Sequence, residues 1–326
     1  MIISKTPLRI SIGGGGTDLE SYYKYDGGSF ISAAIDKYIY IGVNKTFTDD
    51  YFIKYSKLER VENRKDIDHP IIREVFDYLS IDPSIELVSM ADIPAGTGLG
   101  SSGSFTVGLL RALFAYRRQH ISAHELAEIA CQIEIDRLGE PIGKQDQYIA
   151  AYGGLTCFEI DTHGNVSVEP LSISHSTLHD LELNLVLFFT GYSRSASSIL
   201  KDQTTKSNEG DSEMRKNLDE TRMLGKQIRL ALEDGRPEDF GGFMNDHWQR
   251  KRLRSQGMTN PRIDELYDLG MANGAVGGKL VGAGAGGFLM FYAKDVGRLQ
   301  RAFRMKGLSE VVFRFDHDGS TLLARA

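Results

Sequence analysis

The chain has 326 residues, of which 41% are hydrophobic and 25% are charged, and its formal net charge is −6. This acidity argues against nucleic acid as a main partner, because binding to a phosphate backbone requires a basic face. The lack of a hydrophobic signal segment and of a run of about 18 apolar residues predicts no membrane contact. Two cysteines fit a cytoplasmic chain better than a disulfide scaffold, and the length predicts about two domains.

The N-terminal region is predicted to be a strand that a run of glycines ends. Residues 2–12 read as the strand, Gly13 to Gly16 follow, and Thr17 and Asp18 precede a short helix predicted over 19–25. Glycines at this density between regular elements indicate a site lined by backbone, with a loose link as the alternative. Further predictions are a strand pair within 29–44, exposed turns and an edge strand within 46–68, and a helix over 70–79.

A glycine loop between a strand and a helix stands out in the middle of the chain. After a predicted strand at 85–90, residues 93–105 contain four glycines and three serines, and a helix is predicted to about residue 118. Glycine lets the backbone approach a ligand, and the N–H groups that open a helix attract phosphate. The stretch from Gly98 to Gly103 matches a dinucleotide motif, but the second strand with its acidic residue, the P-loop lysine and the protein-kinase motifs are all missing. The loop therefore predicts that a nucleotide phosphate is bound in some other way.

Helices and strands alternate through the rest of the chain. Ser122 and Glu125 form a predicted capping box before an amphipathic helix. The charged run from Arg250 to Arg254 is interpreted as a solvated helix face, and Trp248 as a core residue. The other predictions are a short helix at 144–152, a hairpin at 155–168, a domain boundary within 172–183, a strand at 185–190, helices at 212–232, 237–255 and 261–273, a third glycine cluster at 274–287, a strand at 288–293, and a final helix and strand.

Two acids that follow the glycine loop are candidates for chemistry. Phosphoryl transfer needs positioning, a metal ion, neutralised charge and a group that orients the attacking hydroxyl. Asp146 and Glu134 could divide these tasks, one binding Mg²⁺ and the other accepting the proton. Their spacing alone does not separate this interpretation from that of two solvated carboxylates.

Three motifs in this order resemble those of the GHMP small-molecule kinases. The stretch from Pro7 to Asp18 is similar to the first motif, Pro94 to Phe105 to the second and Lys279 to Gly287 to the third. The resemblance spans nearly the whole chain and implies an α+β, two-domain fold with the active site between the domains. It implies a ribosomal protein S5 domain 2-like N-terminal domain over 1–178 and a ferredoxin-like C-terminal domain over 179–326.

The resemblance also implies roles for individual residues. Asp146 matches the catalytic aspartate and Arg9 the arginine beside it, while Glu134 and Ser102 match ligands of Mg²⁺ and Asp18 a ligand of the sugar hydroxyls. Expected nucleotide-binding residues are Pro94, Gly96, Gly98, Leu99, Gly100, Ser101, Ser102, Gly103 and Ser104. Expected substrate-binding residues are Gly14, Gly15, Gly16, Thr17, Asp18, Ser193, Arg194, Gly284, Ala285 and Gly286.

Ser193 and Arg194 are chosen because, with Ser195, they combine a cation with hydroxyls after a buried strand, which suits a phosphate on the substrate. A polar turn is the alternative interpretation of the same residues. Tyr55 to Lys57 are candidates for the adenine pocket.

The substrate is expected from the first motif. Gly15 and Gly16 stand where galactokinases have Glu-His, so the pocket has room for a longer sugar phosphate. Together with Asp146-Gln-Tyr and the cluster from Asn245 to Lys251, this resembles the branch of the family that uses ATP to phosphorylate the anomeric hydroxyl of a heptose 7-phosphate for GDP-heptose biosynthesis. A homodimer is compatible with the sequence. The alternatives are a kinase for L-fucose, galactose or an N-acetylhexosamine, and a non-catalytic sugar and nucleotide sensor.

Overall fold

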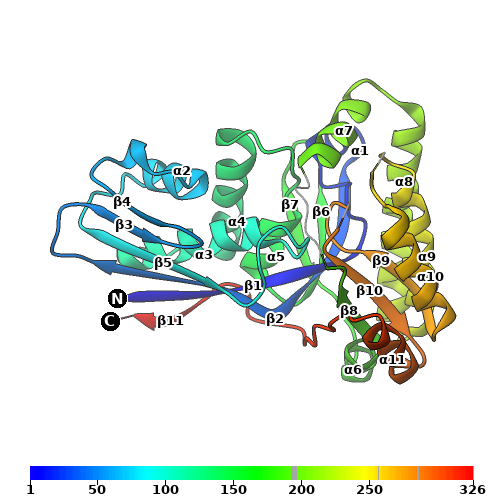
Figure 1. Cartoon of the computed structure of the whole chain (residues 1–326). Coiled ribbons are helices and arrows are strands. Elements are labelled where there is room, and N and C mark those ends of the chain that lie inside the picture. The colour runs from blue at the N-terminus through cyan, green and yellow to red at the C-terminus, as the bar shows by residue number, and fades with distance from the viewer. Residues whose placement is uncertain (192–196, 256, 285, 326) are drawn as a thin grey trace.

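Two long antiparallel strands, β1 (Ile2–Gly13) and β2 (Gly28–Lys45), carry the larger sheet of the molecule (Figure 1). The expected strand pair within 29–44 is wrong, since β2 is one continuous strand. It pairs with β1 from Ile31 to Val43, and the register shifts between Pro7 and Leu8 and again between Ser11 and Gly13. The computed structural model describes residues 1–191, 197–255, 257–284 and 286–325.

The larger sheet branches because the two halves of β2 have different neighbours. Its first half pairs with β6, which pairs with β7, and this hairpin confirms the one predicted at 155–168. Its second half pairs with β5, which is followed by β3 and β4 at the predicted edge. The remaining strands are β3 (Tyr51–Lys54), β4 (Leu58–Val61), β5 (Ile85–Ala91), β6 (Leu155–Ile160), β7 (Val166–Pro170) and β11 (Thr321–Arg325), the last of which pairs with the free side of β1.

A central helix, α3 (Ser101–Tyr116), packs against β1 and β2 and is mostly buried. The predicted capping box is confirmed, because the Ser122 hydroxyl accepts a hydrogen bond from the Glu125 N–H while the Glu125 carboxylate accepts one from the Ser122 N–H. The helix that it starts continues as a π-helical turn, Gln132–Arg137. The other helices of this part are α1 (Glu20–Asp26), α2 (Pro70–Tyr78), α4 (Ala123–Cys131) and α5 (Gln145–Tyr152), with a short 3-10 helix at Arg64–Asp66.

The second sheet is antiparallel, in the order β8 (Leu185–Phe189), β10 (Phe288–Ala293), β9 (Ala275–Leu280). Residues 309–311 run beside the outer edge of β8, where the Val311 N–H donates to the Leu187 carbonyl at 2.9 Å. This completes the strand arrangement of a ferredoxin-like domain. Its helices are α6 (His175–Asn184), α7 (Ser197–Asn208), α8 (Ser212–Glu233), α9 (Glu238–Arg252), α10 (Pro261–Ala272) and α11 (Val296–Met305).

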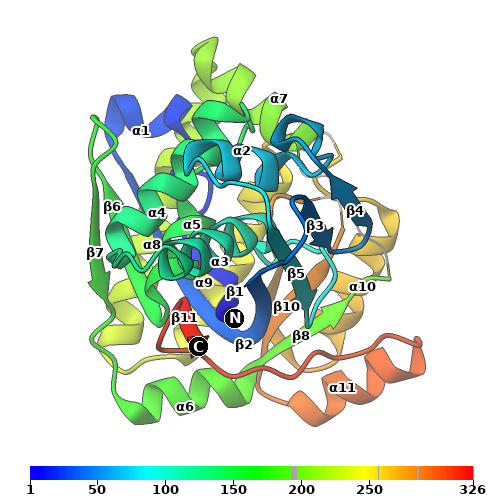
Figure 2. The same ribbon diagram turned by 90° about the vertical axis from the view of Figure 1, so that its left-hand side faces the viewer.

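The segment 172–183, expected to contain a domain boundary, forms most of α6, and Ser174 caps this helix by accepting a hydrogen bond from the Thr177 N–H. Helix α7 was not predicted, and β9 begins inside the expected third glycine cluster. The division at 178 and 179 stays a prediction. The two parts are closely joined, since α8 packs on β1 and β2 and β11 returns to the first sheet (Figures 1 and 2). No helix in the described ranges is long and apolar enough to cross a bilayer.

Candidate active site

A cavity of about 800 Å³ lies where the three glycine-rich segments meet. Gly15 and Gly16 follow β1, Gly143 lies just before α5, and the loop before α3 and the loop after β9 supply the other glycines of the wall. The cavity has an apolar end beside β5 and a charged end beside α7 and α9. The cavity-lining glycines are Gly15, Gly16, Gly96, Gly98, Gly100, Gly143, Gly282, Gly284 and Gly286.

The loop before α3 presents backbone to the cavity. Gly96, Gly98 and Gly100 have φ values of +77°, +88° and +77°, a region that side chains with a Cβ rarely adopt. Gly100 is the N-cap of α3, and no described side chain caps the helix there. Its opening N–H groups are therefore available to a ligand, which is the arrangement that binds phosphate at helix N-termini.

The second and third glycine clusters pack directly against each other. A Cβ on Gly98 would lie 2.6 Å from the Val281 carbonyl oxygen, and one on Gly282 would lie 2.6 Å from the Gly98 Cα. A Cβ on Gly287 would lie 2.1 Å from the Thr97 carbonyl oxygen. Several of these glycines therefore let the backbones of the two loops come into direct contact, which helps to hold the phosphate loop in shape.

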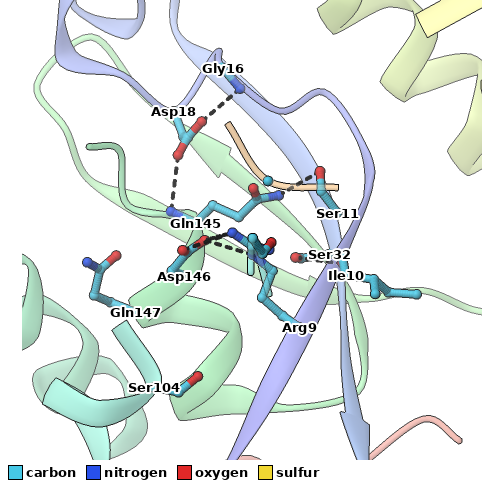
Figure 3. A network of polar contacts seen from close by, with 12 residues as sticks. Arg9, Ile10, Ser11, Gly16, Asp18, Ser32, Ser104, Gln145, Asp146 and Gln147 are labelled. Atoms are coloured by element: carbon cyan, nitrogen blue, oxygen red, sulfur yellow. Dashed lines mark hydrogen bonds and ion pairs between the residues drawn. The ribbon is translucent and has the colours of Figure 1, made fainter. Parts of the chain in front are cut away.

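An ion pair between Arg9 on β1 and Asp146 on α5 lies at the centre of the cavity wall (Figure 3). Arg9 Nε donates to Asp146 Oδ1 at 2.8 Å and Nη2 donates to Oδ2 at 2.9 Å, so the contact is bidentate. The arginine side chain is 6% exposed and that of the aspartate 26%, so the carboxylate is the group open to the cavity. Such a pair holds a carboxylate at a fixed angle beside a fixed positive charge.

Gly103 explains why α5 can lie so close to the phosphate loop. A Cβ at this position would lie 2.7 Å from the Asp146 Cβ. A larger residue at position 103 would therefore push against the backbone and side chain of Asp146.

Glu134 lies in the π-helical turn and is 1% exposed, yet it lines the cavity. Gln147 Nε2 donates to its Oε1 at 3.0 Å. Burial raises the pKa of Glu134 to about 7, against the hydrogen bonds from Gln147, Thr106 and Ser102 that lower it. In the described part of the chain, no cluster of three or more His, Cys, Asp or Glu side chains could hold a metal ion by itself. The Glu134 carboxylate and the Ser102 hydroxyl both line the cavity and are ligands of a suitable kind for Mg²⁺. This ion takes oxygen ligands and completes its coordination shell with substrate phosphates and water.

The first motif forms the wall beyond Asp146. Asp18 accepts hydrogen bonds from the N–H groups of Gly16 at 2.9 Å and of Gln145 at 3.2 Å, and burial raises its pKa (Figure 3). Thr17 is fully buried, and its hydroxyl donates to the carbonyls of Gly14 and Ser29. Gly15, Gly16 and Asp18 line the cavity, whereas Gly14 and Thr17 lie behind it and support the turn.

The charged end contains side chains that the sequence analysis missed. The run from Arg250 to Arg254 is not a uniformly solvated face, because Lys251 and Arg254 are buried at 8% and 4% exposure and line the cavity. His247 and Lys279 are also buried there. The spacing of these residues could have indicated their burial, because positions 247, 251 and 254 share one face of the helix predicted over 237–255. Trp248 is core, as predicted.

The apolar end is shaped for a flat ring. The His69 imidazole stacks on Phe105 with ring centroids 4.9 Å apart and meets Tyr55 edge-on at 4.8 Å. Burial lowers the pKa of His69, which favours the neutral ring. Ile39 and Ile93 complete an apolar surface around the predicted Tyr55.

The other predicted residues divide between the cavity wall and the structure behind it. Ser104 is fully buried, its hydroxyl donates to the Pro7 carbonyl at 2.7 Å, and it does not line the cavity. Leu99 is buried behind the loop. Pro94, Ser101, Ser102, Gly284 and Gly286 line the cavity, while Ser193, Arg194, Ser195 and Ala285 lie outside the described residues.

Two family models match the chain, the GHMP kinases N-terminal domain over residues 69–154 and the GHMP kinases C-terminal domain over residues 228–307. A D-glycero-alpha-D-manno-heptose 7-phosphate kinase of Campylobacter jejuni is 30% identical over 308 residues, which are 89% of each chain. An L-fucokinase/L-fucose-1-P guanylyltransferase of Bacteroides fragilis is 24% identical over 336 residues, which are 90% of this chain and 35% of that relative.

Among solved structures, one described as a D-glycero-D-manno-heptose 1-phosphate kinase from Bacteroides thetaiotaomicron has a TM-score of 0.81 at 24% identity, over 99% of both chains. The chain belongs to the GHMP kinase family. It is a phosphotransferase with the two-domain, mixed α and β fold of that family.

Proposed function

We propose that this protein uses ATP to phosphorylate the anomeric hydroxyl of D-glycero-D-manno-heptose 7-phosphate, giving the 1,7-bisphosphate. The observation that carries the proposal is the bidentate Arg9–Asp146 pair, open to a cavity between a phosphate loop and Asp18. The substrate is taken from the relative named a heptose 7-phosphate kinase, which matches 89% of the chain. With its buried free thiols, we propose that the enzyme works in the cytoplasm.

Asp146 orients the acceptor hydroxyl and takes its proton as the acceptor oxygen bonds to the γ-phosphorus of ATP, while the bond from that phosphorus to the β,γ-bridging oxygen breaks and ADP leaves. A carboxylate has about four lone-pair sites, and Arg9 occupies only one side of it, so the exposed side can accept the proton. Arg9 keeps a positive charge beside the transferred group, and such preorganised charge is more effective in a site that excludes water. The attacking oxygen and the phosphate are held in place by the loop, and positioning supplies much of the rate of phosphoryl transfer.

Glu134 and Ser102 would hold Mg²⁺ beside the phosphates of ATP. Bound there, the ion would neutralise phosphate charge and help to fix the transferred group. Gln147 positions the Glu134 carboxylate through a direct hydrogen bond. The adenine would lie at the apolar end, against His69, Tyr55 and Phe105, with the triphosphate over the N-terminus of α3.

Asp18 accepts hydrogen bonds from sugar hydroxyls, because its carboxylate is fixed by two backbone N–H groups and faces the cavity next to Asp146. Gly15 and Gly16 leave the space that a longer acceptor needs. Gly284, Ala285 and Gly286 remain proposed substrate ligands, while Ser193 and Arg194 are the sequence-based alternative for the phosphate of the substrate.

The first experiment measures ADP release from Mg-ATP with D-glycero-D-manno-heptose 7-phosphate, beside the unphosphorylated heptose, galactose and L-fucose, with phosphorus NMR of each product. An anomeric phosphate formed from the 7-phosphate alone is the expected result. Turnover of L-fucose instead would favour the activity named for the fucokinase relative. Binding of sugar and ATP without any turnover would favour a sensor, although the retained Arg9, Asp146 and Glu134 argue against that interpretation.

A further inference from the structure

Three buried cations at the charged end of the cavity lack an acidic partner. Arg254, Lys251 and Lys279 are 4%, 8% and 2% exposed. Within the described ranges, none of the three forms an ion pair with a carboxylate, and their hydrogen bonds go to neutral groups. Buried charge without a counter-ion is costly. An anion bound at this end of the cavity would therefore supply a negative charge that no direct ion pair among the described residues provides.

The same cations keep N–H groups that no described neighbour uses. The Arg254 guanidinium has five N–H donors, and three bonds to Asn217, Thr221 and the Gly15 carbonyl leave two. The Lys251 ammonium has three, and its bonds to the carbonyls of Leu280 and Gly282 leave one. The neutral groups that accept these hydrogen bonds hold the Arg254 and Lys251 side chains in place, but they carry no compensating negative charge.

A buried side-chain amide adds one more free N–H donor to those of Arg254 and Lys251. Gln203 on α7 is 3% exposed and lines the cavity, and its Nε2 has no hydrogen-bond partner among the described residues. A Cβ on Gly16 would lie 2.7 Å from Arg254 Nη1 and 3.2 Å from Gln203 Nε2. Both donors therefore border the space beside the Gly16 Cα, where the backbone has a φ of +102° and no side chain stands.

The position of these donors relative to Asp146 indicates what they bind. Asp18 accepts hydrogen bonds from both Gln145, the neighbour of Asp146, and Gly16, the neighbour of the donors (Figure 3). A ligand whose middle part contacts Asp18 has one end at Asp146 and its other end at Arg254 and Gln203. An anionic group suits that other end, because it would meet the Arg254 guanidinium and the free Gln203 amide donor.

We propose that Arg254 and Gln203, with Lys251 and Lys279 beside them, bind the phosphate that the sugar already carries, at the end opposite to the hydroxyl that is phosphorylated. The identity of the sugar rests on the proposed function, whereas the site itself requires only a distal phosphate. This assigns the distal phosphate to α7 and the end of α9, in place of Ser193 and Arg194.

The test compares kcat/KM for heptose 7-phosphate with kcat/KM for the free heptose in three variants. Arg254→Gln is expected to lower this preference by about 10- to 100-fold, since it removes charged hydrogen bonds. Gln203→Leu keeps the shape, leaves no partner unsatisfied and is expected to lower it by about 5-fold. Arg250→Gln is the matched control, because that arginine pairs with Glu220 at 3.0 Å and does not line the cavity.

Two further measurements separate phosphate binding from a structural role. The KM for ATP should stay within about 2-fold in all three variants, and calorimetric titration of the sugar phosphate without ATP should weaken in Arg254→Gln and Gln203→Leu only. A preference unchanged in both cavity variants, or lost instead in Arg194→Ala, overturns the proposal. A raised KM for ATP with the preference intact also overturns it, since the cations would then serve the nucleotide.

The preference of the wild-type enzyme for phosphorylated over free sugars distinguishes a failure of this proposal from a failure of the proposed function. Preference for a different sugar phosphate, lost in the Arg254 and Gln203 variants, would remove the heptose assignment and keep the phosphate site. No preference for any phosphorylated sugar over its free form would overturn both.

Discussion

Two parts of the cavity wall offer different groups to a negatively charged ligand. The loop before α3 offers backbone, with glycines at positive φ and the open N-terminus of α3. The charged end offers buried side chains, including Lys251, Arg254 and Lys279. Backbone recognition leaves no room for a Cβ, whereas side-chain recognition depends on charges that are costly to bury. Added side-chain atoms should therefore disturb the glycine loop most, whereas changes of charge or pH should disturb the charged end most.

Asp146→Asn, at the junction of the two ends, should have the largest effect. The amide keeps the size of the side chain and loses the base, so we expect kcat to fall by about 10²- to 10⁴-fold with a modest change in the KM for ATP. Steady-state kinetics with both substrates measures this. A kcat close to that of the wild type would make Asp146 a structural partner of Arg9.

Gly282→Ala tests the backbone end. Its Cβ would lie 2.6 Å from the Gly98 Cα, and the residue has a φ of +80°. We expect a loss in the free energy of unfolding of about 1 to 3 kcal/mol from overpacking, about 1 kcal/mol more from the backbone, and a raised KM for ATP. Denaturant unfolding and ATP kinetics measure the two effects.

Gly242→Ala is the control, because a Cβ added to this exposed glycine of α9 would have no atom within 4 Å. It should be neutral or slightly stabilising. Equal effects of the two substitutions would contradict the idea that the glycine loops interlock.

Lys279→Met tests the charged end through pH. Burial, with Arg254 and Arg9 nearby, lowers the pKa of Lys279 from 10.5 to about 7. Between about pH 7 and 10.5, Lys279 is protonated in the unfolded chain but has released its proton in the folded chain. The contribution of Lys279 to the free energy of unfolding of the wild type therefore rises as the pH rises through this range, and it falls as the pH falls toward 7. The advantage of the methionine variant over the wild type should therefore shrink between about pH 7 and 9, by up to about 3 kcal/mol.

Urea unfolding at several pH values measures this difference, with Lys226→Met on an exposed face of α8 as the control. A difference between variant and wild type that does not vary with pH would show that Lys279 keeps its proton throughout that range.

The smallest effects distinguish two serines of the same loop. Ser104→Ala removes the buried hydrogen bond to the Pro7 carbonyl and should cost about 1 kcal/mol of stability without changing the KM for ATP. Ser102→Ala should leave stability nearly unchanged, because the residue is exposed, and should raise the Mg²⁺ concentration for half-maximal rate roughly 10-fold. The reverse pattern would exchange the two assignments.

Much of the architecture could be predicted from local patterns. The capping box at Ser122, the helix after the glycine loop and the 155–168 hairpin were found because each depends on residues close together in the chain. The continuity of β2 was missed because a strand that changes neighbours halfway has the same local pattern as two strands. Helix α6 was missed because its polar Ser- and His-rich composition resembles that of a linker.

The sequence by itself determined the family, the three glycine segments and the acids that we propose for chemistry, since these are motifs with a fixed order along the chain. Only the tertiary structure decided which hydroxyls and charges face the cavity. Ser102 and Ser104 are two positions apart, yet one lines the cavity and the other is bonded to β1. Likewise, Lys251 is buried while Arg250 and Arg252 on either side are partly exposed. Burial depends on which face of a helix meets distant elements, and that is a property of packing rather than of local composition.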